Sequence, residues 1–429
     1  MKIIVHRGID QIGGCITEIS TVKARILIDL GQNLPNGEGA VDDDLASHEA
    51  IESITQGVDA VFYTHYHGDH LGLFHYVPDN VRQYIGKVAK RVALCKHRQL
   101  SYIKGREQQS KEEIAKLEGM GELSPGQTIT VGDIKITPFF VSHSAYDAYM
   151  FLIEADGKRM LHTGDFRGHG YLSKGLLPTI EKLILSQGKV DFLITEGTML
   201  SRLGEKVMSE NELRRKAGEI MTRYKNVFVM CSSTDVERIA TFYASNKRLK
   251  YRPLVCDHFQ KNILEIFTKS AGEHTPLFRF DEAYDFNPTN TKLLDWMEDK
   301  GFCMFVRATD KFKDYYQALA SRLDPNETIL IYSMWKEYIN DNSKHAVQRY
   351  IDFVSMFPYM ETLHTSGHAS ADCLAKVCNL VNPVLGIIPI HSENSASYKN
   401  LPINEHLQQI IITSSNSTGH VEIRINQSL

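Results

Sequence analysis

The stretch "YTHYHGDHLG", Tyr63–Gly72, places four metal-binding side chains within six positions: His65, His67, Asp69 and His70. It directly follows the apolar run "VDAVFYT", which is typical of a buried strand. Side chains at i and i+2 of an extended segment face the same way, so His65 and His67 can converge on one ion. Asp69 and His70 follow a turn and point toward a neighbouring position. The spacing therefore favours two adjacent metals, which we expect to be zinc, with manganese or iron as alternatives.

Three further ligand candidates stand at the ends of predicted strands. His143 follows "ITPFFVS", Asp165 follows "RMLHT" and His391 follows "VLGIIPI". A carboxylate can span two cations, so Asp165 is the natural bridge. We expect one metal to be bound by His65, His67 and His143, and the other by Asp69, His70 and His391.

Asp29 ends the run "ARILID", from where it can hydrogen-bond the loop ligands from behind. His75 and His162 are left out of the predicted centre. His75 lies more than a turn beyond the motif, and His162 alternates away from its strand end.

Composition places few limits on the function. The 429 residues predict two domains, and 42% hydrophobic with 23% charged residues is typical of a globular protein. A net charge of −4 without a basic block does not indicate nucleic-acid binding, although a local patch stays open. The N-terminus lacks the apolar core of a signal peptide, no run approaches a membrane span, and the seven cysteines are scattered. We therefore expect a cytoplasmic protein with reduced thiols; Cys373 and Cys378 fit the core face of a helix.

The pattern of the chain changes twice. Short apolar or alternating segments, typical of strands, fill the first 200 residues and return after residue 362 as "VLGIIPI", "QIIIT" and "HVEIRI". Between them, strand and helix patterns alternate from "ENELRRKAGEIMTRY" to "KHAVQRYIDFV". This alternation predicts a parallel α/β sheet covered on both faces. We expect a strand-rich domain over residues 1–203 and 362–429, with an α/β domain inserted at 204–361.

The motifs of the first part resemble those of the metallo-β-lactamase superfamily. The resemblance rests on "GIDQIGGCITEI", "LIDLGQNL", "HYHGDH", "VSHS" and "TGDF", which occur in this order. It implies a mixed α/β fold, the four-layer αββα sandwich, with a dinuclear centre between the sheets. It does not imply the substrate, because the superfamily includes lactamases, thioesterases, oxidoreductases and nucleases.

The insert resembles the β-CASP domain of RNase J-like nucleases. Its three motifs are matched by Glu196 in "FLITEGT", by His368 in "LHTSGHAS" and by His391, whose histidine identity is associated with RNA. The resemblance implies a metal-generated hydroxide that attacks phosphorus in line and is oriented by Asp69. His368 would contact the phosphate or protonate the leaving oxygen, and Glu196 would orient His368.

Two polar stretches are candidate phosphate contacts. "SSTDVERI" is similar to a Ser-Asn-Val-His-Arg-Ile stretch of RNase J and offers Ser233 and Thr234. "TSGHAS" precedes a helical pattern and offers Ser366 and Ser370 at a helix N-terminus. Both stretches also have a purely local interpretation, in which Asp235 and Ser370 cap helices and Arg238 forms an ion pair.

Some features depart from the family. The sequence ends about 40 residues after His391, so we expect it to lack the C-terminal domain of RNase J, and a homo-oligomer stays open. Ser392 replaces a usual glycine, and "SMWKEYIND" lacks a usual Pro-Gly-Asn. The leading hypothesis is a ribonuclease with two zinc ions and RNA as partner, without a membrane, in exonuclease or endonuclease mode. The alternatives are a hydrolase of a small phosphodiester or other small substrate, and a metal-bearing protein that binds RNA or a partner without turnover.

Overall fold

A computed structural model describes residues 1–35, 42–413 and 421–425, and the chain divides into two compact units. The first unit is built from Met1–Leu34, Val41–Lys206 and Gly367–Leu429, and the second mainly from Val207–Ser366. The second unit is thus an insertion in the first. Its seams lie at 206/207 and 366/367, whereas the sequence placed them at 203/204 and 361/362.

The first sheet of the first unit has seven strands in the order β19-β1-β2-β3-β4-β5-β6. β19, β1, β2 and β3 pair antiparallel, and β3 to β6 pair in parallel. Parallel neighbours need crossover connections, which here include α1 (His48–Thr55), α3 (Lys87–Leu100) and α4 (Glu107–Gly119). The strands are β1 (Lys2–Arg7), β2 (Ile16–Ser20), β3 (Arg25–Ile28), β4 (Ala60–Phe62), β5 (Arg82–Gly86), β6 (Gly121–Leu123) and β19 (Val421–Arg424).

The second sheet has six strands in the order β18-β11-β10-β9-β8-β7. β10, β11 and β18 run in parallel, so their carboxyl ends meet at one edge of the sheet. Asp165, Glu196 and His391 all lie at this edge, because each ends or closely follows one of the three strands. The strands are β7 (Ile129–Val131), β8 (Ile134–Val141), β9 (Ala148–Ala155), β10 (Lys158–His162), β11 (Phe192–Glu196) and β18 (Gly386–Ile390).

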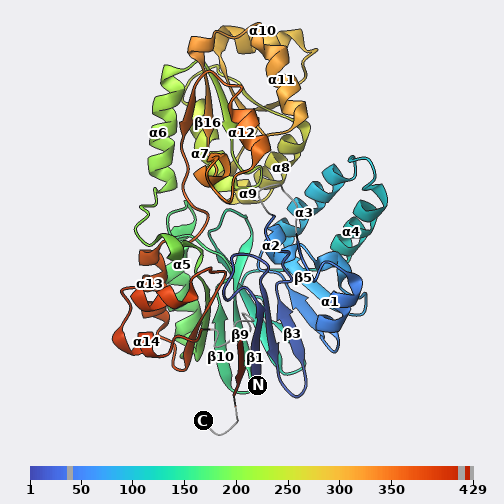
Figure 1. Ribbon diagram of the computed structural model, residues 1–429, viewed down its shortest axis with the longest axis vertical. Helices are drawn as coiled ribbons and strands as arrows, with labels where there is room; N and C mark the ends of the chain where they lie inside the picture. Colours follow the sequence, from blue (N-terminus) through green and yellow to red (C-terminus); the bar gives the residue numbers. More distant parts are fainter. Residues whose placement is uncertain (36–41, 414–420, 426–429) are drawn as a thin grey trace. The chain divides into compact units, whose positions relative to one another are not determined.

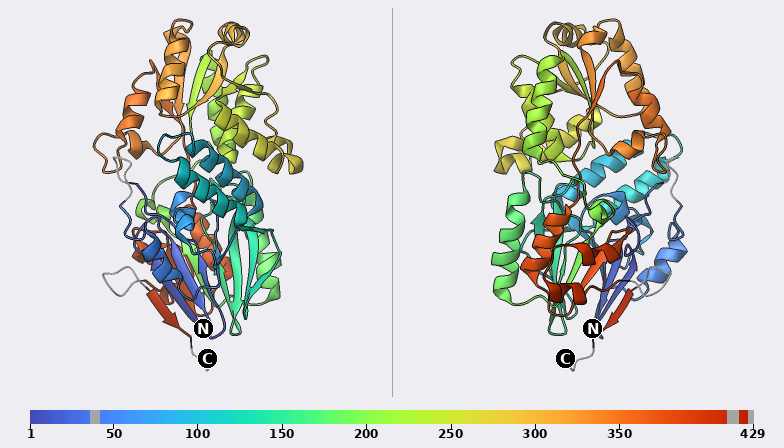
Figure 2. Two further views of the ribbon diagram at one scale, coloured as in Figure 1. Left: turned by 90° about the vertical axis from the view of Figure 1, so that its right-hand side faces the viewer. Right: turned by 60° about the vertical axis from the view of Figure 1, so that its left-hand side comes forward.

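The two sheets pack face to face, as the alternation along β9 illustrates. Phe151 and Ile153 join the core between the sheets, whereas Met150 and Leu152 join the core beneath the helices. That outer core is covered by α5 (Leu176–Thr179), α13 (Ala371–Val381) and α14 (Glu405–Gln409), and Figure 1 shows α1, α3 and α4 beside the first sheet. The views in Figure 2 show the same layers. The expected helix–sheet–sheet–helix sandwich is confirmed.

The second unit contains a parallel six-stranded sheet in the order β14-β13-β15-β12-β16-β17, as the sequence predicted. Every residue of β12, β15 and β16 is buried, as expected for strands covered on both faces. The strands are β12 (Asn226–Met230), β13 (Leu254–Cys256), β14 (Ala283–Asp285), β15 (Phe302–Val306), β16 (Thr328–Tyr332) and β17 (Met360–Thr362). The helices, most of them labelled in Figure 1, are α6 (Glu210–Arg223), α7 (Val236–Lys247), α8 (His258–Thr268), α9 (Ala271–His274), α10 (Thr291–Lys300), α11 (Asp310–Ala320) and α12 (Gln348–Val354).

One predicted strand is wrong. "QIIIT", residues 409–413, begins at the last residue of α14, and only Ile411 forms an isolated bridge, with Ile387. Ile410 and Ile411 pack against the core beneath the helices, so packing rather than strand pairing explains the apolar run. The segment with Cys373 and Cys378 forms the helix α13, as expected. Its buried face includes Leu374, Val377, Cys378 and Val381, and both cysteines are free thiols. Within the described residues, no helix is long and apolar enough to cross a membrane.

Candidate metal centre

The loop after β4 presents the histidines of the opening motif. Pairing continues beyond the strand, because Tyr63 N donates to Tyr84 O and Thr64 O accepts from Tyr149 N, at 2.8 and 2.9 Å. His67 keeps an extended backbone as the N-cap of the one-turn helix α2 (Gly68–Leu71). The change from strand to helix therefore falls between the pair His65 and His67 and the pair Asp69 and His70, as the spacing predicted.

The first group of ligand candidates consists of His65, His67 and His143. His67 Nδ1 lies 3.1 Å from His65 Nε2 and 3.2 Å from His143 Nε2. Ligand nitrogens 2.0–2.1 Å from one tetrahedral ion are separated by about 3.3 Å. Both distances from His67 Nδ1 are thus close to those expected around a single cation, and the ligand atoms of all three histidines lie within 4.8 Å of one another.

Hydrogen bonds behind these rings fix which nitrogen carries the proton. Thr64 donates its single hydroxyl proton to Asp29 Oδ2, so its oxygen accepts from His65 Nδ1 at 3.0 Å. His143 Nδ1 donates to the carbonyl of Gly367 at 2.8 Å. In both neutral rings Nε2 therefore carries no proton, and its lone pair is directed at His67 Nδ1. Without a cation, a proton on His67 Nδ1 can be donated to one of these lone pairs; with a cation, all three nitrogens can bind it.

The second group consists of Asp69, His70 and His391. His391 Nε2 lies 3.0 Å and His70 Nε2 4.0 Å from Asp69 Oδ2. His70 Nδ1 donates to Asp29 Oδ2 at 2.7 Å, which directs Nε2 into the site. Asp29 thus lies where the sequence placed it, behind a ligand. A carboxylate in this position orients the ring and raises its basicity as a ligand.

Asp165 lies between the two groups. Its Oδ2 is 3.1 Å from His70 Nε2, 3.6 Å from His391 Nε2 and 3.9 Å from His143 Nε2. Its Oδ1 is buried and has no hydrogen-bond partner. Burial alone would raise the pKa of Asp165, but the charges of His391, His70 and His368 hold this pKa well below its usual range. An ionised, buried carboxylate with an unpaired oxygen fits a bridging ligand.

Burial also keeps the first group of histidines neutral. It lowers the pKa of His65 and of His143 well below the usual value, with nearby histidine charges adding to the effect. The same cause lowers the pKa of His67 to about 4. Neutral imidazole is the form that binds metal, so no proton has to be displaced at these three rings.

Glu196 connects three segments around the centre. Its Oε1 accepts hydrogen bonds from Phe166 N and Ala369 N, each at 3.1 Å. Its Oε2 lies 3.2 Å from His368 Nδ1. Burial would lower the pKa of His368, but the charges of Glu196 and Asp165 raise it to about 9. His368 Nδ1 is 3.6 Å from Asp165 Oδ2, so its ring adjoins the ligand groups.

The loops around the centre approach one another closely. A Cβ atom on Gly31 would lie 1.8 Å from Asp69 O, so only glycine fits beside the motif. Asp29 and His391 both adopt left-handed backbone conformations, with φ of 61° and 52°. Such conformations are uncommon outside glycine and are concentrated at functional sites.

The residues of "SSTDVERI", the phosphate contacts predicted in the second unit, differ in whether a local partner already engages them. Ser233 Oγ accepts a hydrogen bond from Arg307 Nη1 at 3.3 Å, and Thr234 Oγ1 lies 3.3 Å from Ser232 Oγ. Asp235 caps α7, accepting from Arg238 N at 3.2 Å. Arg238 is buried and ion-paired with Glu210 at 3.0 Å. Asp235 and Arg238 therefore have the local roles of cap and ion pair, and Ser233 adjoins the partly exposed Arg307.

The remaining candidates lie around the "TSGHAS" turn. Ser370 is the N-cap of α13 and accepts from Cys373 N at 3.3 Å. The capping interpretation thus holds for Ser370, although its hydroxyl proton can still be donated elsewhere. Ser366 is half-buried and is the last residue of the second unit.

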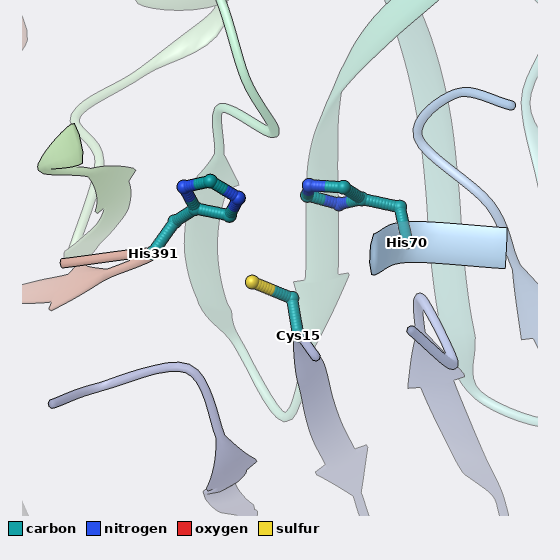
Figure 3. A group of neighbouring side chains, drawn as sticks. All are labelled: Cys15, His70 and His391. Carbon is teal, nitrogen blue, oxygen red and sulfur yellow. The ribbon is translucent and has the colours of Figure 1, made fainter. Parts of the chain in front are cut away.

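Three residues at the centre were missed by the sequence reasoning. Thr64 fixes His65, and Thr198 Oγ1 lies 2.7 Å from His391 Nδ1 and 3.2 Å from His368 Nδ1. Cys15 has its sulfur close to His70 and His391 (Figure 3). Its place in "GIDQIGGCITEI" was the available signal. Burial raises the pKa of the Cys15 thiol well above its usual value.

Comparison with known proteins relates part of the chain to a family. Residues 24–219 match the sequence model of the beta-lactamase superfamily domain. This match supports a relationship to the metallo-β-lactamase superfamily. Members of this superfamily bind divalent metals, and the histidine and aspartate groups described above are compatible with such binding.

The chain is also similar to RNase J proteins. It is 24% identical to Ribonuclease J of Helicobacter pylori over 92% of its own length and 56% of that protein. It is 24% identical to Ribonuclease J of Thermus thermophilus, over 92% of the chain and 68% of the relative. An RNase J-like protein of Methanocaldococcus jannaschii is 26% identical over 59% of the chain and 57% of the relative. The chain thus spans little more than half the length of most of these curated relatives.

One solved structure has the same fold over almost the whole chain. A protein of unknown function from Enterococcus faecalis superposes with a TM-score of 0.71 at 20% sequence identity, covering 98% of this chain and 99% of the other. The likeness supports the two-part architecture, with the metallo-β-lactamase fold and its insert. It carries no information on the substrate.

Proposed function

We propose that this protein is a metal-dependent ribonuclease that hydrolyses phosphodiester bonds of RNA. The second unit would be a β-CASP domain, and the metals would be two zinc ions, with manganese as the alternative. The observation that carries the proposal is the convergence of His65 and His143 on His67 Nδ1 and of His70 and His391 on Asp165, with the His368–Glu196 pair directly beside them. The Ribonuclease J relatives supply the substrate class.

The side chains of the first unit divide into three roles. His65, His67 and His143 would hold one metal, and Asp69, His70 and His391 the other, with Asp165 between them. Two bound divalent ions supply an activated water molecule and neutralise charge on the phosphate. Asp69 would orient that water, since its carboxylate is at the edge of the second group.

His368 is the proposed proton donor to the leaving oxygen. Its Nδ1 is engaged by Glu196 Oε2, so the opposite ring nitrogen is the one presented to substrate. With a pKa raised to about 9 by Glu196 and Asp165, the ring is protonated at neutral pH and can donate. Glu196 acts through His368 and through the loops of Phe166 and Ala369, so it is a positioning residue.

The second unit would contribute contacts to the RNA backbone. Arg307 is 27% exposed, and together with the partly exposed Lys311 it pairs with the buried Asp257, which leaves one net positive charge beside Ser233. A cation next to a hydroxyl is a typical phosphate contact. Ser233 and Thr234 on this unit, and Ser366 and Ser370 at the turn before α13, are the proposed phosphate-binding residues.

The test is hydrolysis of a single-stranded RNA labelled at its 5′ end, with a monophosphate or a hydroxyl there. Release of labelled mononucleotides would indicate a 5′ exonuclease, and internal fragments an endonuclease; either supports the proposal. Turnover of a small phosphodiester without RNA cleavage would overturn it in favour of a small-substrate hydrolase. RNA binding by metal-loaded protein without cleavage would overturn it in favour of a binding protein.

A further inference from the structure

Cys15 lies at the second group of metal ligands, and the fold fixes its position there. It directly precedes β2 and is 2% exposed. Its backbone N donates to Asp69 O and its carbonyl accepts from Gly31 N, both at 3.1 Å. A Cβ on Gly8 would lie 3.0 Å from the sulfur, so the thiol is confined on that side as well. These contacts hold the Cys15 backbone beside the motif loop, and Gly8 limits where its sulfur can lie.

The sulfur shares a site with two histidines whose other nitrogens are engaged. Ligand atoms of Cys15, His70 and His391 all lie within 4.8 Å of one another, and Figure 3 shows the sulfur between the two rings. His70 Nδ1 is held by Asp29 and His391 Nδ1 by Thr198. The Nε2 atoms face the carboxylates of Asp165 and Asp69, and a cation between them would take the place of a shared proton. Two imidazole nitrogens and one cysteine sulfur are donor atoms that zinc sites combine.

We propose that Cys15 is a ligand of the metal ion held by His70 and His391. On binding, the thiol proton would leave to solvent and the sulfur would bind as thiolate. The first position has only imidazole nitrogens besides Asp165, so the two positions would differ in donor type. Thiolate favours zinc over manganese and magnesium, and the second position would therefore be the more zinc-selective one. This inference rests on the proposed metal centre but not on the proposed ribonuclease activity.

Cobalt(II) is the probe, because a cobalt–thiolate bond has a charge-transfer band in the near ultraviolet that nitrogen and oxygen ligands lack. Metal-free full-length protein is titrated with Co²⁺ while near-ultraviolet and visible absorption are recorded. The wild type should develop the charge-transfer band along with the visible bands of bound cobalt. The Cys15→Ser variant should lose the near-ultraviolet band and keep the visible bands of the first position. Cys95→Ser, which changes a half-buried cysteine on α3, should behave as the wild type.

Zinc affinity gives a second readout that is independent of catalysis. Competition with a chelator should show a loss of at least about tenfold in affinity for one of two zinc ions in Cys15→Ser. Two bound cobalt ions without a thiolate band, or a band that survives in Cys15→Ser, would overturn the proposal for Cys15 alone. Failure of the wild type to bind cobalt or zinc at all would overturn the metal centre itself. Circular dichroism of Cys15→Ser and Cys15→Ala checks that the variants are folded.

Discussion

Glu196 orients His368 through a hydrogen bond of 3.2 Å between Oε2 and Nδ1. The other oxygen of Glu196 accepts from Phe166 N and Ala369 N, which are the residues next to Asp165 and His368. One buried carboxylate thus joins the strand end that bears Asp165, the proposed bridging ligand, to the turn that bears the proposed proton donor. Within the described residues, the Glu196 side chain hydrogen-bonds the proposed proton donor but none of the proposed metal ligands directly. Proton transfer and metal binding can therefore be tested with separate variants.

His368→Ala should lower kcat for RNA by about 10²–10⁴-fold, the usual contribution of a general acid. Metal content should stay unchanged, because the metal is expected on other residues. Steady-state kinetics and elemental analysis of the same preparation measure both. His75→Gln, a histidine outside the candidate metal groups, is the control. Loss of metal would mean that His368 is itself a ligand, as its closeness to His143 and Asp165 permits.

Asp29→Asn should weaken metal binding at the second position by about 10–100-fold, since Asp29 holds His70 Nδ1 at 2.7 Å. The three-histidine position should be affected less, because His143 is held by Gly367 instead. Competition titrations with a chelator would resolve the two affinities. Asp44→Asn, at an exposed carboxylate, should leave both unchanged. Two unchanged affinities in Asp29→Asn would remove its proposed role.

Arg307→Ala should reduce RNA binding and lower the slope of log affinity against log salt by about one phosphate contact. Asp257 would keep Lys311 as partner, so the buried carboxylate is not left unpaired. Filter binding or fluorescence anisotropy at several salt concentrations measures the slope. Arg322→Ala is the matched control, because Arg322 pairs with Asp295 and Glu298. An identical salt slope in Arg307→Ala and wild type would argue against a phosphate contact beside Ser233.

Glu18 should make the first unit sensitive to acid. Glu18 is 1% exposed, and although burial alone would raise its pKa, hydrogen bonds from His6 and Arg25 lower it to about 2. A lowered folded-state pKa gives stability that is present above about pH 4.5 and is lost as the pH falls toward 2. Glu18→Gln should therefore be less stable than wild type at neutral pH, by about 2 kcal/mol, and the difference should shrink in acid.

Thermal unfolding midpoints from neutral pH to about pH 3 measure this difference. Glu154→Gln changes a more exposed carboxylate of the same unit and should not alter the pH profile. Parallel profiles for wild type and Glu18→Gln would show that Glu18 contributes no acid-labile stability.

Local pattern was enough to predict most of the fold. The strands at residues 134–141 and 148–155, for example, are apolar runs that end at turn residues. The candidate ligands could also be predicted, since they lie in one short motif or at the ends of parallel strands. The ends of β10, β11 and β18 meet at one sheet edge whatever the details of packing.

What the sequence could not predict depends on contacts between distant segments. Cys15 is near His391 only because β2 lies beside the motif loop, and no spacing reveals this. Thr198 reaches two histidines that are about 170 and 190 residues away. "QIIIT" misled because a short apolar run that packs on a core has the same composition as a buried strand.

The central claim is a centre of two metals, and elemental analysis of dialysed protein tests it most directly. Wild type should contain about two transition-metal ions per chain. His67→Ala should contain about one, because both His65 Nε2 and His143 Nε2 lie next to His67 Nδ1 in the first group. The same His67→Ala preparation should lose RNA cleavage. Wild type without bound metal that still cleaves RNA in the presence of a chelator would contradict the account.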